Sequence, residues 1–179
     1  KKSISTFITN KLKLKVNEEK SVVCEVDKSV LLGHTILKDG NLVIATENIK
    51  RFKNSIRKIT KRNRGASFEQ VISELNPKLR GWFEYYKHTK SKGLFRDLDA
   101  WIRRKLRCFR IKQTKRAMGL VRFLKNLGIV TYQAWIIALS GVGWWRKSAA
   151  PQIHHAMSNS WFREQNLFNL SLNYEKVYY

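Results

Sequence analysis

The spacing of apolar residues changes near residue 47 of this 179-residue chain, and that change limits what the chain can fold into. Before it, Leu12-Lys13-Leu14-Lys15-Val16 alternates with period two, which is typical of a strand with one buried face. After it, Ile49, Phe52, Ile56 and Ile59 recur every three or four residues, which predicts an amphipathic helix. The sequence therefore predicts an α+β chain, predominantly α, in which a small antiparallel β element precedes a helical region.

The β element is expected within residues 1–46. Three further apolar runs are β-rich: Ser21–Val26, Val30–Ile36 and Leu42–Ile44. Asp39-Gly40, just before the last run, is a hairpin signal. Such short strands make an element too small to be stable alone.

Residues 47–113 predict a three-helix bundle with short connections. The first helix should end at Asn63–Gly65, and Ser67 should cap the second helix in a capping box with Gln70. Asn76-Pro77 has the form of a further helix start. The third helix is expected from Ser91 or Gly93, with either Trp101 or Ile102 facing inward.

Residues 114–179 predict shorter helices. One is expected from Lys115 to Asn126, a second from Thr131 to Leu139, and a last one from Pro151 to Phe162. Ser140–Gly143 should be a loop because it is rich in glycine.

The positive charge is concentrated in one part of the chain. The net charge is +23, and residues 47–125 hold 24 Lys and Arg against 6 Asp and Glu. Such a surplus implies a polyanionic partner, because cations near phosphates release counterions on binding. We therefore expect the helices from Glu47 to Lys125 to present one continuous surface to a nucleic acid, with Tyr85 stacking on bases. For Trp82 and Trp101, which lie on apolar stripes, core packing is the favoured alternative.

Several other classes of protein are disfavoured. Cys24 and Cys108 are far apart, so reduced thiols in a cytoplasmic protein are expected, and no membrane span is visible. Asp97 and Asp99 would point apart on a helix, so no metal site is predicted. No residues form a catalytic constellation, which argues against an independent nuclease or transferase. Because the first residue is not Met, we expect a piece of a longer protein.

The order of motifs resembles group II intron reverse transcriptases, also called maturases. Residues 11–21 resemble the strand and turn after the family's catalytic motif, and Leu31-Leu32-Gly33-His34 resembles its primer-grip hairpin. Ile59–Gly65, Ile72-x-x-Leu75-Asn76-x-x-Leu79-Arg80-Gly81-Trp82-Phe83-x-Tyr85-Tyr86 and Leu98–Arg107 are similar to the maturase-specific domain. Gly143–Ser148, Ala156–Asn159 and Trp161-Phe162 resemble the C-terminus of bacterial members, so the resemblance spans most of residues 3–170.

The resemblance implies three segments with separate roles. Residues 1–46 would be the edge of the polymerase palm with the primer grip, residues 47–113 the thumb or X domain, and residues 114–179 a helical extension that binds nucleic acid. The parent enzyme would be an RNA-directed DNA polymerase using Mg²⁺, but its Tyr-x-Asp-Asp motif would lie before Lys1. This chain is therefore expected to be inactive alone and to hold no cofactor. Its partners would be intron RNA, a template–primer duplex and the upstream fingers and palm.

Within this resemblance, basic side chains are the candidate RNA contacts. Those at the first helix and its following loop are Arg57, Lys61, Arg62 and Arg64, and those at the Pro77 helix start are Lys78 and Arg80. A second stripe comprises Arg103, Arg104, Arg107, Arg110, Lys112, Lys115 and Arg116. Leu32, Gly33 and His34 would contact the primer, and Arg80 has an alternative role as an ion-pair partner of Glu84. The alternative function is a free-standing basic RNA-binding or assembly module without a polymerase.

Overall fold

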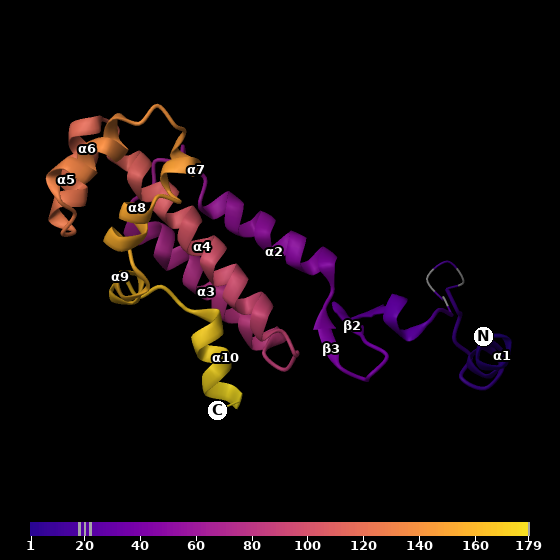
Figure 1. The fold of residues 1–179 in the computed structure, drawn as a ribbon. Helices are drawn as coiled ribbons and strands as arrows, with labels where there is room; N and C mark the ends of the chain where they lie inside the picture. Colours follow the sequence, from indigo (N-terminus) through magenta and orange to yellow (C-terminus); the bar gives the residue numbers. More distant parts are fainter. Residues whose placement is uncertain (18, 20, 22, 179) are drawn as a thin grey trace. The chain divides into compact units, whose positions relative to one another are not determined.

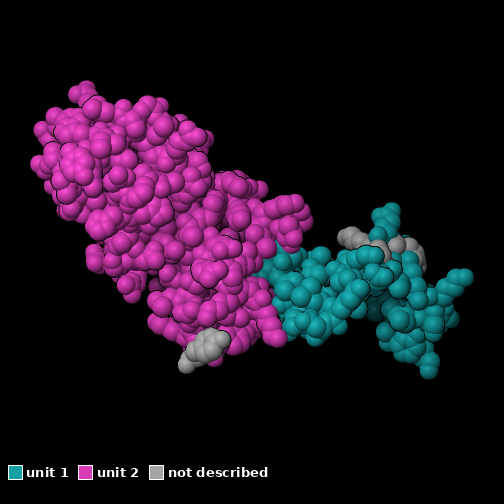
Figure 2. All heavy atoms as spheres, viewed as in Figure 1, with its two compact units in different colours: residues 1–45 teal, residues 46–179 magenta. Residues whose placement is uncertain are grey.

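A computed structural model describes residues 1–17, 19, 21 and 23–178 of the chain. These residues form two compact units, Lys1–Ala45 and Thr46–Tyr179 (Figure 2). Both helices and strands are present, with helices prevailing, as the sequence predicts (Figure 1). No helix in this described part is long and apolar enough to cross a membrane.

The first unit contains a small antiparallel sheet. Strands β1 (Val30–Leu31), β2 (His34–Ile36) and β3 (Leu42–Ile44) pair in chain order. Asp39-Gly40 lies in the turn between β2 and β3, where Gly40 has a φ of 79°, so the predicted hairpin is confirmed. Helix α1 (Lys2–Asn10) and the 3₁₀ helix η1 (Val26–Lys28) precede the sheet.

Two predicted strands of the first unit are wrong. The described residues of Leu12–Val16 and Ser21–Val26 form no strand, and Val22 lies outside the described residues. A strand needs a partner for its backbone hydrogen bonds, and none of the described residues pairs with Leu12–Val16. Leu12 and Leu14 are both exposed, so their alternation does not mark a buried face here.

The second unit is built on three long helices, α2 (Thr46–Ile59), α3 (Phe68–Tyr86) and α4 (Lys92–Gln113). Their apolar stripes form a common core that includes Phe52, Leu75, Phe83 and Ile102, all nearly inaccessible to solvent. Ser67 and Gln70 form the predicted capping box at the start of α3. Ile102, rather than Trp101, faces the core from α4.

Helix α3 runs through Pro77, so the predicted helix start at Asn76-Pro77 is wrong. A proline inside a helix removes one hydrogen bond, but burial of Leu75 and Leu79 on either side favours a continuous helix. The Asn76 side chain does not cap this helix. It donates to the carbonyl of Asn166 (2.8 Å) and accepts from the backbone N–H of Phe168 (2.9 Å).

The described residues after α4 form six shorter helices within the same unit. They are α5 (Ala117–Asn126), α6 (Thr131–Leu139), α7 (Trp144–Lys147), α8 (Pro151–Ala156), α9 (Asn159–Glu164) and α10 (Leu170–Tyr178). The predicted helix from Pro151 to Phe162 is therefore divided, because Ser158 caps a new helix. Helices α5 and α6 pack on each other, and α10 packs on α4 and α3.

Candidate nucleic-acid interface

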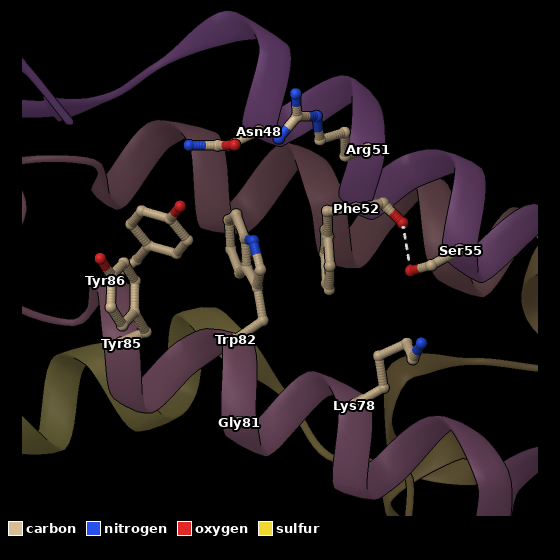
Figure 3. Close-up of a pocket in the computed structure, with 9 residues that line it drawn as sticks. All are labelled: Asn48, Arg51, Phe52, Ser55, Lys78, Gly81, Trp82, Tyr85 and Tyr86. Atoms are coloured by element: carbon tan, nitrogen blue, oxygen red, sulfur yellow. Dashed lines mark hydrogen bonds between the residues drawn. The ribbon is translucent and has the colours of Figure 1, made fainter. Parts of the chain in front are cut away.

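One hollow of the second unit lies between α2 and α3, and we call it the α2–α3 groove (Figure 3). Its volume is about 470 Å³. Its lining comprises Asn48, Arg51, Phe52, Ser55, Lys78, Gly81, Trp82, Tyr85 and Tyr86. The lining thus combines two cationic side chains with four aromatic ones and contains no carboxylate.

The aromatic side chains of the groove have different roles. Trp82 stacks on Phe52, with ring centroids 4.1 Å apart and an interplanar angle of 13°, and lies 4.9 Å from the Tyr86 ring. Trp82 is therefore a packing residue, as its position on an apolar stripe predicted. Burial raises the pKa of the Tyr86 hydroxyl. Tyr85 is 53% exposed, so its ring is accessible for the stacking that was predicted.

A second hollow, which we call the cationic hollow, lies where the α2–α3 connection meets the end of α4. It has a volume of about 390 Å³ and is lined by Arg62, Gly65, Ala66, Phe109, Lys112, Gln113 and Lys115. Two contacts fix its walls: the Lys112 ammonium donates to Asn63 Oδ1 (2.7 Å), and the Gln113 amide donates to the carbonyl of Ala66 (3.0 Å). The fold thus unites Arg62 with Lys112 and Lys115, which the sequence placed in separate groups.

The third feature is a group of cations around Trp101, which we call the Trp101 face. Lys53, Arg57 and Lys105 have their charged atoms 5.8, 5.5 and 5.7 Å from the Trp101 ring centroid. Burial, and then repulsion by Arg57, lower the pKa of the Lys105 ammonium. Since Lys105 and Arg62 line one small cavity of about 120 Å³, the Trp101 face adjoins the cationic hollow.

The predicted position of Arg107 on an exposed stripe is wrong. Arg107 is buried, and its guanidinium donates two hydrogen bonds, of 3.0 and 2.8 Å, to the carbonyl of Met157. Burial, with the nearby charge of Arg103, lowers the pKa of Arg107 to about 10. The C-terminal helices cover this side of α4, which the pattern of α4 alone does not reveal.

Two other predicted RNA contacts, Arg64 and Arg80, interact with side chains of this chain. Arg64 forms an ion pair with Glu74, which raises the pKa of the guanidinium. Arg80 lies 5.4 Å from the Phe168 ring centroid, while Glu84 pairs with Lys87 at 2.6 Å, so the alternative pairing of Arg80 with Glu84 is wrong.

Contrary to the sequence prediction, Lys78 and Arg80 do not lie at the start of a helix. Both lie in the middle of α3, where the backbone N–H groups are engaged in the helix, so no helix start supports a phosphate there. Both side chains remain exposed.

The remaining candidates differ in exposure. Lys61, Lys115 and Arg116 are exposed, whereas Arg103, Arg104 and Arg110 are half-buried. Burial lowers the pKa of Arg103, and the Asp99 carboxylate opposes this. Arg104 lies 4.1 Å from the ring centroid of Trp145, and Arg110 lies 4.6 Å from that of Phe123. RNA contact by any of these residues stays a prediction.

The proposed primer-grip residues form the turn between β1 and β2. Leu32 and Gly33 both have positive φ, of 50° and 80°, and His34 Nδ1 lies 3.0 Å from the carbonyl oxygen of Leu32. The hairpin is therefore present, and its role at a primer stays a prediction.

Four residues of these surfaces are absent from the predicted RNA contacts: Arg51, Lys53, Lys105 and Trp145. Lys53 lies four residues before Arg57 and therefore on the same face of α2, so helical spacing could have indicated it, whereas Arg51 lies on a different face and lines the groove. No local signal indicates Trp145, because it approaches α4 only through the tertiary packing of α7 on α4.

The described residues contain no group of three or more His, Cys, Asp or Glu side chains placed to hold an ion. Asp99 is buried and Asp97 is exposed, as expected for side chains that point apart on a helix.

Cationic helices with accessible aromatic side chains are typical of proteins that bind nucleic acids. Residues 49–128 match the family described as group II intron, maturase-specific domain. The predicted resemblance is confirmed for this segment, which is a little less than half of the chain and includes the whole cationic hollow. A search of curated proteins found no match to the chain.

Proposed function

We propose that this chain binds the folded RNA of a group II intron and assists its splicing, as the thumb and maturase portion of a reverse transcriptase. One observation carries the proposal: the family match at residues 49–128 coincides with the segment in which cations outnumber carboxylates 24 to 6. The α2–α3 groove, the cationic hollow and the Trp101 face all draw residues from this segment.

The chemistry of these surfaces suits structured RNA. Helical RNA is recognised mainly through phosphates and 2′-hydroxyls, which require cations and hydrogen-bond donors rather than base-reading groups. Lysine and arginine side chains supply both, and Tyr85 adds a ring for an unpaired base. In this proposal, the parent enzyme would also contain the palm aspartates that hold Mg²⁺, and the β1–β2 turn would lie near the primer.

The test is a binding assay on the whole chain with two RNAs, a group II intron and an unrelated structured RNA of equal length. We expect tighter binding to the intron and a log–log salt dependence with a slope of several units, since several phosphates are contacted. Equal affinity for the two RNAs, or a slope near zero, would contradict the proposal.

A second test concerns splicing directly. Adding the chain to an intron that does not self-splice at low Mg²⁺ should increase the splicing rate. The lysine and arginine side chains of the bound protein would neutralise RNA phosphates and so stabilise the compact RNA. No increase at saturating protein would leave RNA binding intact but rule out maturase activity for this chain.

A further inference from the structure

Gly81 lies in the interior of α3, is exposed, and has no structural partner that requires a glycine. A glycine inside a helix destabilises the fold relative to alanine, because its backbone loses more conformational freedom on folding. Here a Cβ atom at position 81 would meet no described atom within 4 Å. Nor does the backbone require glycine, because the φ angle of Gly81 is not in the positive range that favours glycine. Packing and backbone geometry therefore give no reason for glycine at this position.

Gly81 does line the α2–α3 groove. Figure 3 shows Gly81 on α3 next to Trp82, with Arg51 on the facing helix α2. A side chain at position 81 would stand in open space at the edge of the groove rather than in the core, since Gly81 is exposed and lines the groove. The bare Cα thus leaves room for something that approaches the helix backbone closely.

The charge of the groove indicates what that occupant is. Arg51 and Lys78 contribute cations from the two walls, and the lining contains no carboxylate. The nearest acid along α2, Glu47, accepts a hydrogen bond of 2.7 Å from Lys50, which lowers the pKa of its carboxyl. A groove with two cations and a bare backbone position favours a phosphate-bearing strand over an apolar or basic peptide.

We propose that one sugar–phosphate backbone of the bound RNA lies in the α2–α3 groove against Gly81, with its phosphates contacted by Arg51 and Lys78. Tyr85, at the same side of the groove, would stack on a base of that strand. This inference rests on the proposed function and identifies where on the chain the RNA backbone approaches most closely.

A pair of matched substitutions tests the inference. Gly93 is also helical and exposed, and a Cβ there meets nothing within 4 Å, but it does not line the groove. Gly81→Leu should weaken RNA binding about tenfold, a loss comparable to that of one charge-assisted hydrogen bond. Gly93→Leu should leave affinity unchanged. The further variants Gly81→Ala and Gly93→Ala should each unfold at or above the temperature of the parent chain, because alanine favours helix.

Charge-removing variants give a second measurement. Arg51→Gln and Lys78→Gln should each lower the log–log salt slope by about one unit, since each removes one phosphate contact. If the parent chain binds RNA but Gly81→Leu binds as tightly, the inference is overturned while the proposed function stands. The same holds if Gly93→Leu is weakened equally. If the parent chain binds no RNA at all, the proposed function is overturned and this inference with it.

Discussion

Asp99 Oδ1 on α4 accepts a hydrogen bond of 3.0 Å from the backbone N–H of Leu170, the first residue of α10. The other carboxylate oxygen accepts from the N–H of Ser171 at 2.8 Å. One buried side chain therefore satisfies two backbone donors at the start of the last helix, where negative charge is also favoured by the helix dipole. The docking of α10 on the three-helix core depends on this contact, together with a hydrogen bond from the Tyr174 hydroxyl to the carbonyl of Thr89 (3.0 Å).

Asp99→Asn should therefore loosen α10. The amide keeps one acceptor oxygen but turns an NH₂ group toward the second backbone donor, so we expect a loss of about 1–3 kcal/mol in the free energy of unfolding. Denaturant unfolding measures the loss, and hydrogen exchange should show faster exchange in α10. Asp97→Asn is the control, because Asp97 is exposed on the same helix. Equal effects of the two substitutions would contradict this role of Asp99.

The same carboxyl makes stability depend on pH. Burial raises the pKa of Asp99 above its ordinary value of 3.8, although the N–H groups of Ser171 and Leu170 oppose the shift. The folded state thus binds this proton more tightly than the unfolded chain, so the stabilisation is complete below about pH 3.8 and is lost as the pH rises through the folded pKa. The stability of the parent minus that of Asp99→Asn should fall over this interval in unfolding curves. A rise in this stability difference would show that the hydrogen bonds to the carboxylate favour its charged form by more than burial disfavours it.

Arg107→Lys should destabilise the fold without changing the salt dependence of RNA binding. Lysine keeps the charge but cannot make the two hydrogen bonds to the Met157 carbonyl, and we expect a loss of about 1–3 kcal/mol. Because Arg107 is buried, it contributes no surface phosphate contact. Thermal unfolding and salt titrations of RNA affinity measure the two effects. A lower salt slope in Arg107→Lys would show that this residue does reach the RNA.

Local signals predicted the helices of the second unit well. Ser67 and Gln70 act within one turn, and the start of α4 after Ser91 and the end of α5 before Gly128 also depend on neighbours in sequence. The predictions for Arg107 and Pro77 are wrong because tertiary packing decides the environment of both residues. The C-terminal helices bury Arg107, and core packing favours a helix that continues through Pro77.

The candidate site was predicted less completely than the helices. Charge clustering predicted the segment in which the three candidate surfaces lie, because net charge is a property of sequence alone. Charge clustering could not predict that Arg62 and Lys112 lie together, because tertiary contacts, such as that of Lys112 with Asn63, bring them together. Nor could it foresee that Arg64 is neutralised by Glu74, ten residues later and on another element.

The two cysteines should differ sharply in reactivity. Cys24 is exposed, whereas Cys108 is buried, and burial raises the pKa of the Cys108 thiol despite the nearby charges of Arg62 and Lys105. A thiol reacts as the thiolate, so brief alkylation at neutral pH should modify Cys24 and leave Cys108 intact. Mass spectrometry of the digested chain measures this, with denatured protein as the control in which both react. Fast modification of Cys108 in the folded protein would mean that solvent reaches this side of α4.

Removing the charges of the cationic hollow should weaken RNA binding more than removing equal charge elsewhere. The triple variant Arg62→Gln, Lys112→Gln, Lys115→Gln should lower the log–log salt slope by about two to three units, since each side chain is expected to neutralise one phosphate. The matched control replaces Arg122, Lys125 and Lys176, which are exposed and do not line the hollow, by glutamine. Both variants carry the same net charge, so long-range attraction is equal and only local contacts differ. Equal slopes for the two variants would mean that the hollow holds no phosphate and that the RNA responds to net charge alone.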